Sequence, residues 1–136
     1  MMFINYIYNA INKFLNMIIH DKYRIIYING IYDIIYGMCV LGIYSLPFFN
    51  KIHLDMFYEP LDPTTKRFFG YYLLLQGACR TTYLNDNNNN IAWFSYILEA
   101  IIFIYESLVH ETVDPIKGLS VSISCLIFAS VCSPRI

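Results

Sequence analysis

Residues 91–109 read IAWFSYILEAIIFIYESLV, an apolar run that contains two carboxylates, Glu99 and Glu106. A helix of about 20 apolar residues is long enough to cross the hydrocarbon core of a bilayer. An ionised side chain at the centre of a bilayer costs about 3 kcal/mol or more, so such residues usually face other helices or a polar cavity. The run therefore predicts a membrane-spanning helix whose polar side is directed toward other helices of the same protein.

The composition of the whole chain also favours a membrane protein. Of its 136 residues, 57% are apolar and only 14% are charged, and the mean hydropathy is +0.47. Ordinary soluble domains carry about 25% charged residues, so this chain has too little charge to cover a soluble globule. The net charge of −1 gives no electrostatic basis for binding nucleic acid, because phosphate contacts require clustered lysine and arginine.

Polar connections divide residues 25–136 into four apolar stretches, so we predict an all-α, integral membrane four-helix bundle. We place the four spans at about residues 29–49, 67–84, 91–110 and 118–134. Residues 1–24 form a separate amphipathic segment, which we expect to lie as a helix in the membrane interface. Lysine and arginine are spread almost evenly over the two sides, so their distribution does not predict an orientation.

In the last apolar stretch, small residues recur at the spacing of a helix. Ser120–Ser124 alternates polar and apolar residues as a strand would, but helical spacing accounts for more of the segment. Small residues let membrane helices approach closely, because lipid supplies no hydrophobic drive to bring them together. The sequence therefore predicts a long contact stripe on the fourth span and a shorter one on the second, formed by Gly118, Ser122, Cys125, Ala129 and Cys132, and by Gly70 and Gly77.

Glu99, Glu106 and His110 recur at helical spacing on one face of the third span. Such a face can hold a metal ion or transfer protons, but helical di-iron sites use Glu-x-x-His on two helices together with two further carboxylates. This chain has a different spacing and no second copy. The simpler interpretation is structural pairing, in which Glu106 pairs with Arg80 or Arg67, while Glu99 takes a hydroxyl partner or stays protonated.

The remaining polar and sulfur-containing residues give no signature of catalysis. We expect Asp33 to lie at headgroup depth, where its cost is small, and His20 and His53 to be solvated. The sequence contains no dinucleotide-binding, P-loop or nucleophile-elbow motif. The cysteines lie apart in apolar surroundings, which predicts buried free thiols at Cys39, Cys79, Cys125 and Cys132. We therefore predict a non-enzyme without a cofactor or a bound metal.

One set of residues follows an order that is known from a protein family. Arg67-Phe68-Phe69-Gly70 is followed by Arg80, by Glu106 in the next span, and then by Pro115 and Gly118. Over residues 67–132, this order resembles the ergosterol biosynthetic protein 28 family. The resemblance implies that the matching polar and small residues fix the bundle and present its partner-binding faces. With Glu99, the candidates for these roles are Arg67, Gly70, Arg80, Glu99, Glu106, Pro115 and Gly118.

The resemblance also implies a function. Members of that family are small four-span proteins of the endoplasmic reticulum, and they act as non-catalytic scaffolds that hold the enzymes of sterol C4-demethylation together. The expected partners are thus membrane lipids and membrane-bound enzymes of sterol biosynthesis, and assembly with further copies of the chain is compatible with this role.

Two other hypotheses remain open from the sequence. One is a small transporter or proton-conducting bundle in which Glu99, Glu106 and Arg80 line a path. The other is a viral or parasite membrane protein that shares only the fold with the scaffold family. A scaffold is expected to tolerate Glu99→Gln, whereas a proton path requires a carboxylate that titrates.

Overall fold

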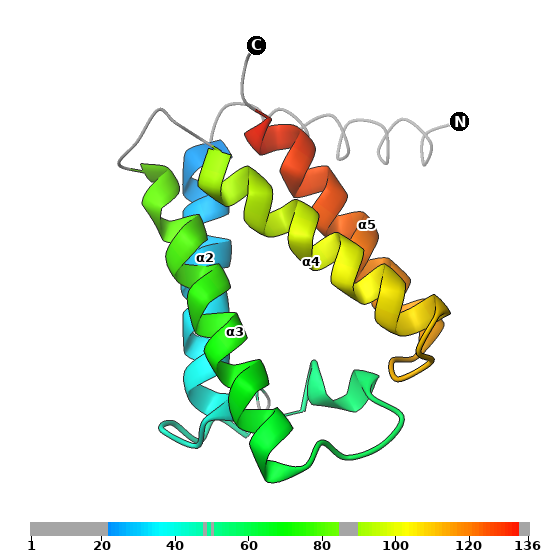
Figure 1. Ribbon diagram of the computed structural model, residues 1–136. Helices are drawn as coiled ribbons and strands as arrows, with labels where there is room; N and C mark the ends of the chain where they lie inside the picture. The colour runs from blue at the N-terminus through cyan, green and yellow to red at the C-terminus, as the bar shows by residue number, and fades with distance from the viewer. Residues whose placement is uncertain (1–21, 48, 50, 85–89, 134–136) are drawn as a thin grey trace, which may run out of the picture.

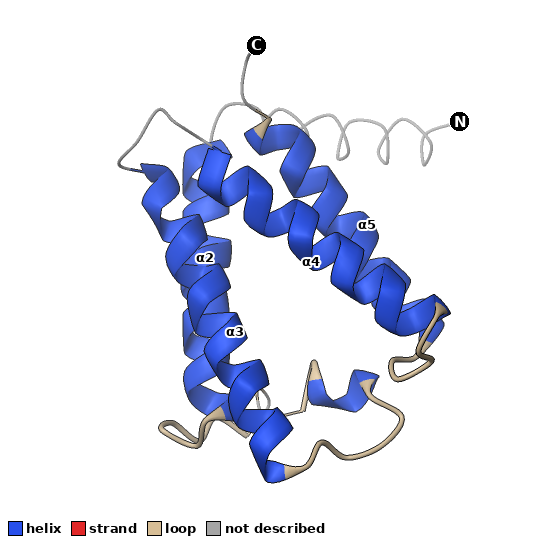
Figure 2. Ribbon diagram, in the orientation of Figure 1, coloured by secondary structure: helices blue, strands red, loops and turns tan. Residues whose placement is uncertain are grey.

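The computed structural model of the chain describes residues 22–47, 49, 51–84 and 90–133. Figure 2 shows helices joined by loops, and the described residues contain no strand, only an isolated bridge between Phe57 and Val113. The predicted all-α class is confirmed. In chain order, the elements are α2 (Lys22–Val40), η1 (Leu54–Met56), α3 (Pro63–Thr81), η2 (Thr82–Leu84), α4 (Asn90–Leu108) and α5 (Pro115–Cys132), where η denotes a short 3₁₀-helix.

The four α-helices form two hairpins, α2 with α3 and α4 with α5 (Figure 1). The hairpins meet at the end where α3 leads into α4, and they diverge toward the opposite end. At that opposite end, η1 and its flanking loop pack against the α4–α5 turn, since Met56 and Val113 belong to one buried cluster with Phe103 of α4. Contacts within each hairpin are far more extensive than contacts between them.

Glycine pairs bring α2 and α3 into close contact. A Cβ atom on Gly77 would lie only 2.6 Å from the carbonyl oxygen of Gly30, and one on Gly37 would lie 2.9 Å from that of Gly70. Only residues without a Cβ allow such an approach, which is how membrane helices commonly associate. The predicted contact stripe of Gly70 and Gly77 is therefore present, and Gly30 and Gly37 supply its partner on α2.

The stripe predicted for the last span forms the contact between α5 and α4. The buried residues of α5 are the five small residues of that stripe, Gly118, Ser122, Cys125, Ala129 and Cys132. The Ser122 hydroxyl lies 3.1 Å from the carbonyl oxygen of Ala100 on α4, and a Cβ atom on Gly118 would collide with the Ser107 hydroxyl. The strand interpretation of Ser120–Ser124 is wrong, because these residues are helical.

Helix α2 differs from the first predicted span, which we placed at 29–49. It runs from Lys22 to Val40 and ends because of a glycine, Gly42, which has φ +77°. The Gly42 N–H donates to the carbonyl oxygen of Cys39, and the Ile43 N–H donates to that of Met38, both at 3.0 Å. This is the Schellman arrangement that commonly ends helices. Residues 22–24 thus belong to α2, whereas residues 1–21 of the predicted interfacial segment lie outside the described residues.

Helices α3 and α5 begin with the same Asp-Pro signal. The Asp62 carboxylate accepts from the backbone N–H groups of Thr64 (2.9 Å) and Thr65 (3.2 Å), and a proline occupies the first helical position. Asp114 caps α5 in the same way. Proline fits this position because it needs no partner for an N–H group. The signal starts α3 at Pro63, before the residue 67 that we predicted.

The cap on α3 gives an expected pH dependence. Hydrogen bonds from the Thr65 hydroxyl and from two backbone N–H groups lower the pKa of Asp62 below its ordinary value of 3.8. The stabilisation is therefore complete above that value and is lost as pH falls through the lower pKa of the folded state. We expect Asp62→Ala to lower the thermal stability at pH 7 and this difference to vanish in strong acid, as measured by circular dichroism in detergent. Glu59→Ala, at an exposed position of the preceding loop, should leave the thermal stability at pH 7 close to that of wild type. If Glu59→Ala lowered the thermal stability as much as Asp62→Ala, the capping role of Asp62 would be contradicted.

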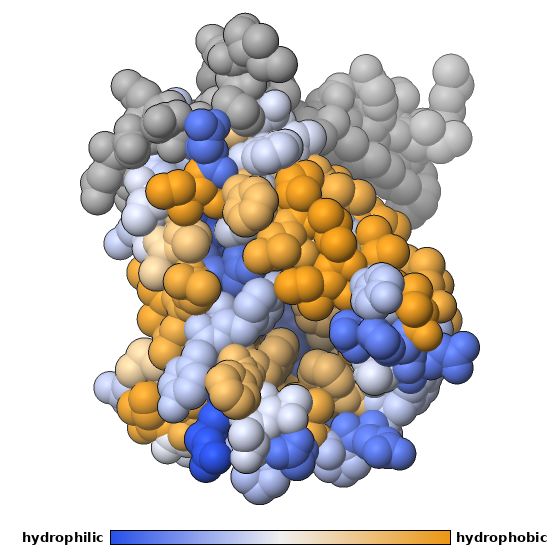
Figure 3. Space-filling view, viewed as in Figure 1, coloured by the Kyte–Doolittle hydropathy of each residue, from blue (hydrophilic) through white to orange (hydrophobic). Residues whose placement is uncertain are grey.

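Two of the described helices are long and apolar enough to cross a membrane, α4 and α5. Within the chain, only 39% of the most apolar 18-residue segment of α4 is buried, and only 28% of that of α5. The core helix of a soluble protein would be mostly buried. Figure 3 shows hydrophobic side chains covering this part of the molecule. Helices α2 and α3 do not reach the same hydropathy, since charged residues interrupt them. The apolar outer surface of α4 and α5 therefore indicates contact with lipid.

Candidate functional site

A buried charge cluster joins the two hairpins. Its centre is Arg80, near the end of α3, whose guanidinium group is held by Asp33 of α2 at 2.5 Å and forms a second ion pair with Glu99 of α4. The three residues are only 2%, 5% and 8% exposed. Asp33 lies on the face of α2 that carries Gly30 and Gly37, so the glycine contact directs its carboxylate into the bundle. The cluster thus ties three helices together.

Polar and aromatic side chains complete the surroundings of the guanidinium group. Its Nε donates to the Ser95 hydroxyl at 3.3 Å, and its Nη1 lies 3.4 Å from the amide oxygen of Asn29. The ring of Tyr96 lies 3.9 Å from the guanidinium carbon, a cation–π distance, and its hydroxyl donates to Asn29. A buried charge requires partners of this kind on every side, since an unpaired one is very costly.

An interior cavity of about 210 Å³ borders this cluster and is lined by residues of all four helices. On the side of the η1 segment, His53 is one of its lining residues: the Nε2 atom of its ring lies 3.1 Å from the Tyr32 hydroxyl, and its backbone N–H donates to the Tyr36 hydroxyl, also at 3.1 Å. Burial lowers the pKa of His53, so the imidazole is neutral at pH 7. The prediction that His53 is solvated is therefore wrong, while His20 lies outside the described residues.

The pairing that we predicted for the glutamates is also wrong. Glu99, not Glu106, pairs with Arg80, whereas the Glu106 carboxylate accepts from the Thr112 hydroxyl at 2.5 Å near the end of α4. Arg67 is exposed, and within the described part of the chain its guanidinium group lies 3.4 Å from the Thr64 hydroxyl. The reason is geometric, because Arg80 lies beside the first half of α4, while Glu106 lies two turns beyond Glu99, where the hairpins diverge.

Asp33 and His110 also differ from the predictions. Asp33 is buried in the middle of α2 and not near a helix end, and its ion pair with Arg80 makes this burial tolerable. His110 is exposed beyond α4, with its ring edge against Tyr105 at 4.9 Å. Among the described residues, no three His, Cys, Asp or Glu side chains come together as metal ligands. The four cysteines all lie in the described part of the chain and form no disulfide there; Cys39, Cys125 and Cys132 are buried as predicted, whereas Cys79 is only half-buried.

Comparison with known proteins gives one match. A family model described as "Erg28 like protein" matches residues 6–133, nearly the whole chain. The chain belongs to the Erg28-like family. The resemblance seen over residues 67–132 is thus confirmed, and the match lengthens it toward the N-terminus as far as residue 6. Neither a curated protein nor a solved structure gives a significant match. Membership of the Erg28-like family links the chain to sterol biosynthesis and to membranes, and the family is generally one of non-catalytic scaffolds.

Proposed function

We propose that this chain is a non-catalytic scaffold of the endoplasmic reticulum membrane, which holds the enzymes of sterol C4-demethylation together. The match to the Erg28-like family over residues 6–133 is the observation that carries the proposal. The geometry agrees with such a role, because the charged groups in the core of the bundle form ion pairs with each other in a buried cluster. The same cluster leaves the outer helix faces apolar and available to membrane-bound partners.

The proposal includes a four-span arrangement of residues 25–136. The charges that lower the hydropathy of α2 and α3 either lie in the first two turns of these helices, as do Arg24, Lys66 and Arg67, or are paired in the interior, as are Asp33 and Arg80. Paired interior charges and charges at helix ends are both compatible with a membrane span. Helices of 18 and 19 residues are about 27–28 Å long, close to the hydrocarbon thickness of about 30 Å.

The outer faces of α3 and α4 are the best candidates for contact with partner proteins. On α3, the exposed large side chains Phe68, Tyr71 and Leu75 recur at helical spacing. On α4, exposed side chains form a second row at helical spacing, made of Ile91, Phe94, Leu98, Ile101 and Tyr105. Aromatic residues dominate protein interfaces because they bury large areas at low entropic cost. The two rows lie nearest to each other where the hairpins meet, since Leu75 lines one pocket with Ile91, Phe94 and Leu98, and they diverge toward the opposite end.

The candidate residues divide between the interior and the ends of the bundle. Arg80 and Glu99 form the buried cluster, Gly70 and Gly118 lie at helix contacts, and Pro115 starts α5. We propose that these five residues hold the bundle rigid. Two candidates retain exposed surface at the end that carries η1, and we propose that they contact partner domains outside the membrane; they are Arg67 and Glu106.

The test is affinity purification of the tagged full chain from its native membranes in mild detergent, followed by mass spectrometry. We expect a sterol oxidase, a decarboxylating dehydrogenase and a ketoreductase to co-purify. Phe68→Ala combined with Phe94→Ala should reduce their recovery at least about threefold, which is the effect expected if one of these two aromatic anchors is a hot spot of the interface. The matched control is Ile123→Ala combined with Ile127→Ala, on the exposed face of α5, which should retain the enzymes.

Recovery of homo-oligomers alone, without any of these enzymes, would contradict the scaffold and would favour the transporter hypothesis. That hypothesis requires Glu99, Glu106 and Arg80 on one path. Glu99 and Arg80 border the interior cavity, but Glu106 is not among its lining residues. The geometry therefore supports the scaffold better.

A further inference from the structure

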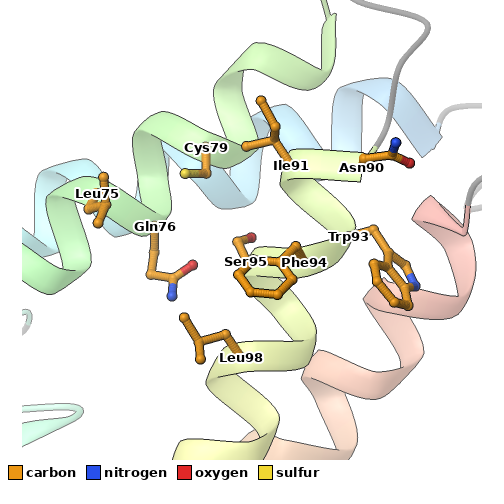
Figure 4. A pocket seen from close by; sticks show the side chains of 9 residues that line it. All are labelled: Leu75, Gln76, Cys79, Asn90, Ile91, Trp93, Phe94, Ser95 and Leu98. Carbon is orange, nitrogen blue, oxygen red and sulfur yellow. The ribbon is translucent and has the colours of Figure 1, made fainter.

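A groove opens between α3 and α4 at the end where the hairpins meet. It has a volume of about 470 Å³, within the range of about 300–1,000 Å³ that is typical of sites for small molecules. Figure 4 shows side chains from both helices around it. Most of the lining is apolar and is formed by Leu75, Cys79, Ile91, Trp93, Phe94 and Leu98. In a membrane, this groove would face the lipid side of the bundle.

One polar group in the groove has no partner. Gln76 is only 4% exposed, and its Oε1 accepts no hydrogen bond from any described residue. The amide lies beside the Tyr72 hydroxyl, which also has no hydrogen-bond partner among the described residues. Figure 4 shows the amide pointing from α3 toward Ser95 and Leu98, into the groove. A buried acceptor of this kind favours any ligand that brings a donor to it.

The other polar groups near the groove are already engaged. The Ser95 hydroxyl lies 2.8 Å from the carbonyl oxygen of Ala92, to which it donates, and accepts from Arg80. Arg80 is itself saturated by Asp33 and Glu99. A charged headgroup would therefore find no free countercharge among the described residues of the groove, whereas a single hydroxyl group would satisfy its one open acceptor.

We propose that this groove binds one monohydroxy lipid with a rigid apolar body, of the sterol alcohol type, whose hydroxyl group donates to Gln76 Oε1. The apolar walls bury the body of the ligand, and the amide oxygen selects the donor. A rigid body is favoured over a flexible chain, because it loses less conformational freedom on binding. This site lies beside the charge cluster, not within it, and the inference goes beyond the scaffold role and does not depend on it.

The test uses the purified full chain in lipid nanodiscs with tritiated cholesterol as the probe. We expect saturable binding that is displaced by unlabelled cholesterol, and only weakly by cholestenone, its 3-keto analogue, because the ketone has no proton to donate. Oleyl alcohol, which carries the same donor on a flexible chain, should also compete weakly. Gln76→Leu preserves the size of the side chain and should weaken cholesterol binding about tenfold, while cholestenone binding stays unchanged.

Two further variants control for folding and location. Leu98→Trp should fill the groove and reduce binding of both sterols, whereas Ile127→Ala, on the exposed face of α5, should leave binding unchanged. All variants are first compared with wild type by melting temperature and gel filtration. Equal affinity of wild type and Gln76→Leu, or competition by oleyl alcohol as strong as by cholesterol, would overturn the proposal.

A partner helix that fills the groove is the competing occupant. A photoreactive residue in place of Phe94 should crosslink to a radiolabelled sterol in native membranes, and crosslinks to protein alone would contradict the proposal. Because the nanodisc experiment contains no sterol-pathway enzyme, its failure leaves the co-purification experiment of the scaffold unaffected. The two proposals can therefore fail separately.

Discussion

Replacement of Arg80 by methionine is expected to destabilise the folded chain by about 3–5 kcal/mol, the cost that is typical when one partner of a buried ion pair is removed. Methionine keeps the apolar part of the side chain but leaves Asp33 and Glu99 buried, close together and without a countercharge. Their desolvation is then no longer offset, and the contact between the two hairpins weakens. The measurement is chemical unfolding of the purified chain in detergent, followed by circular dichroism.

Two further variants separate the charge effect from the loss of a side chain. Arg67→Met removes an exposed arginine whose hydrogen bond to Thr64 is long, at 3.4 Å, so it should cost less than about 1 kcal/mol. Adding Asp33→Asn and Glu99→Gln to Arg80→Met removes the uncompensated charges and should recover much of the lost stability. If Arg80→Met were as stable as Arg67→Met, Arg80 would not be the buried centre of the bundle.

The sequence predicts the class of this fold well, because helical spacing is visible without a partner. The five small residues of α5 follow a helical pattern over its whole length, and all five are buried against the rest of the bundle. Likewise, the low charge of residues 91–109 predicts a helix with one polar side, and Glu99 lies on that side. Both predictions rest on a local repeat, which tertiary contacts do not change.

The sequence of α4 alone could not predict the partner of Arg80, because this helix carries two glutamates, Glu99 and Glu106. Only the crossing of the helices decides which of them lies beside Arg80. A signal did exist on α2, where Gly30, Asp33 and Gly37 share one face. A carboxylate between two contact glycines must point toward the neighbouring helix. We predicted for Asp33 only a position at headgroup depth, and its role in the cluster was not predicted.

The bounds of α2 were missed for a different reason. The residues after Val40 are still mostly apolar, so hydropathy alone does not indicate where the helix ends, because it carries no information on backbone conformation. The stop comes from Gly42 at φ +77°, a conformation that residues with a Cβ rarely adopt. The groove beside Gln76 also escapes sequence analysis, since it depends on how far two helices stand apart.

The second large effect is expected at Gly77, where α3 and α2 are closest. In most exposed helix positions, replacing glycine stabilises a helix by up to about 1 kcal/mol. Here the sign should reverse, because a Cβ atom would lie 2.6 Å from the Gly30 carbonyl oxygen and 2.6 Å from Ile34 Cγ1. A backbone oxygen cannot move aside as a flexible side chain can, so Gly77→Val must push the helices apart. We expect a loss of about 3 kcal/mol or more, at the upper end of the usual cost of overpacking.

Ala78→Val is the matched control, since Ala78 is the next residue of α3 and is exposed. It introduces the same side chain into the same helix without a facing backbone, so thermal unfolding in detergent should change by less than about 1 kcal/mol. The separation of the helices has a further consequence, because Asp33 would be drawn away from Arg80. Gly77→Val combined with Arg80→Met should therefore cost less than the sum of the two single changes. Strict additivity would mean that the glycine contact and the charge cluster are independent supports of the bundle.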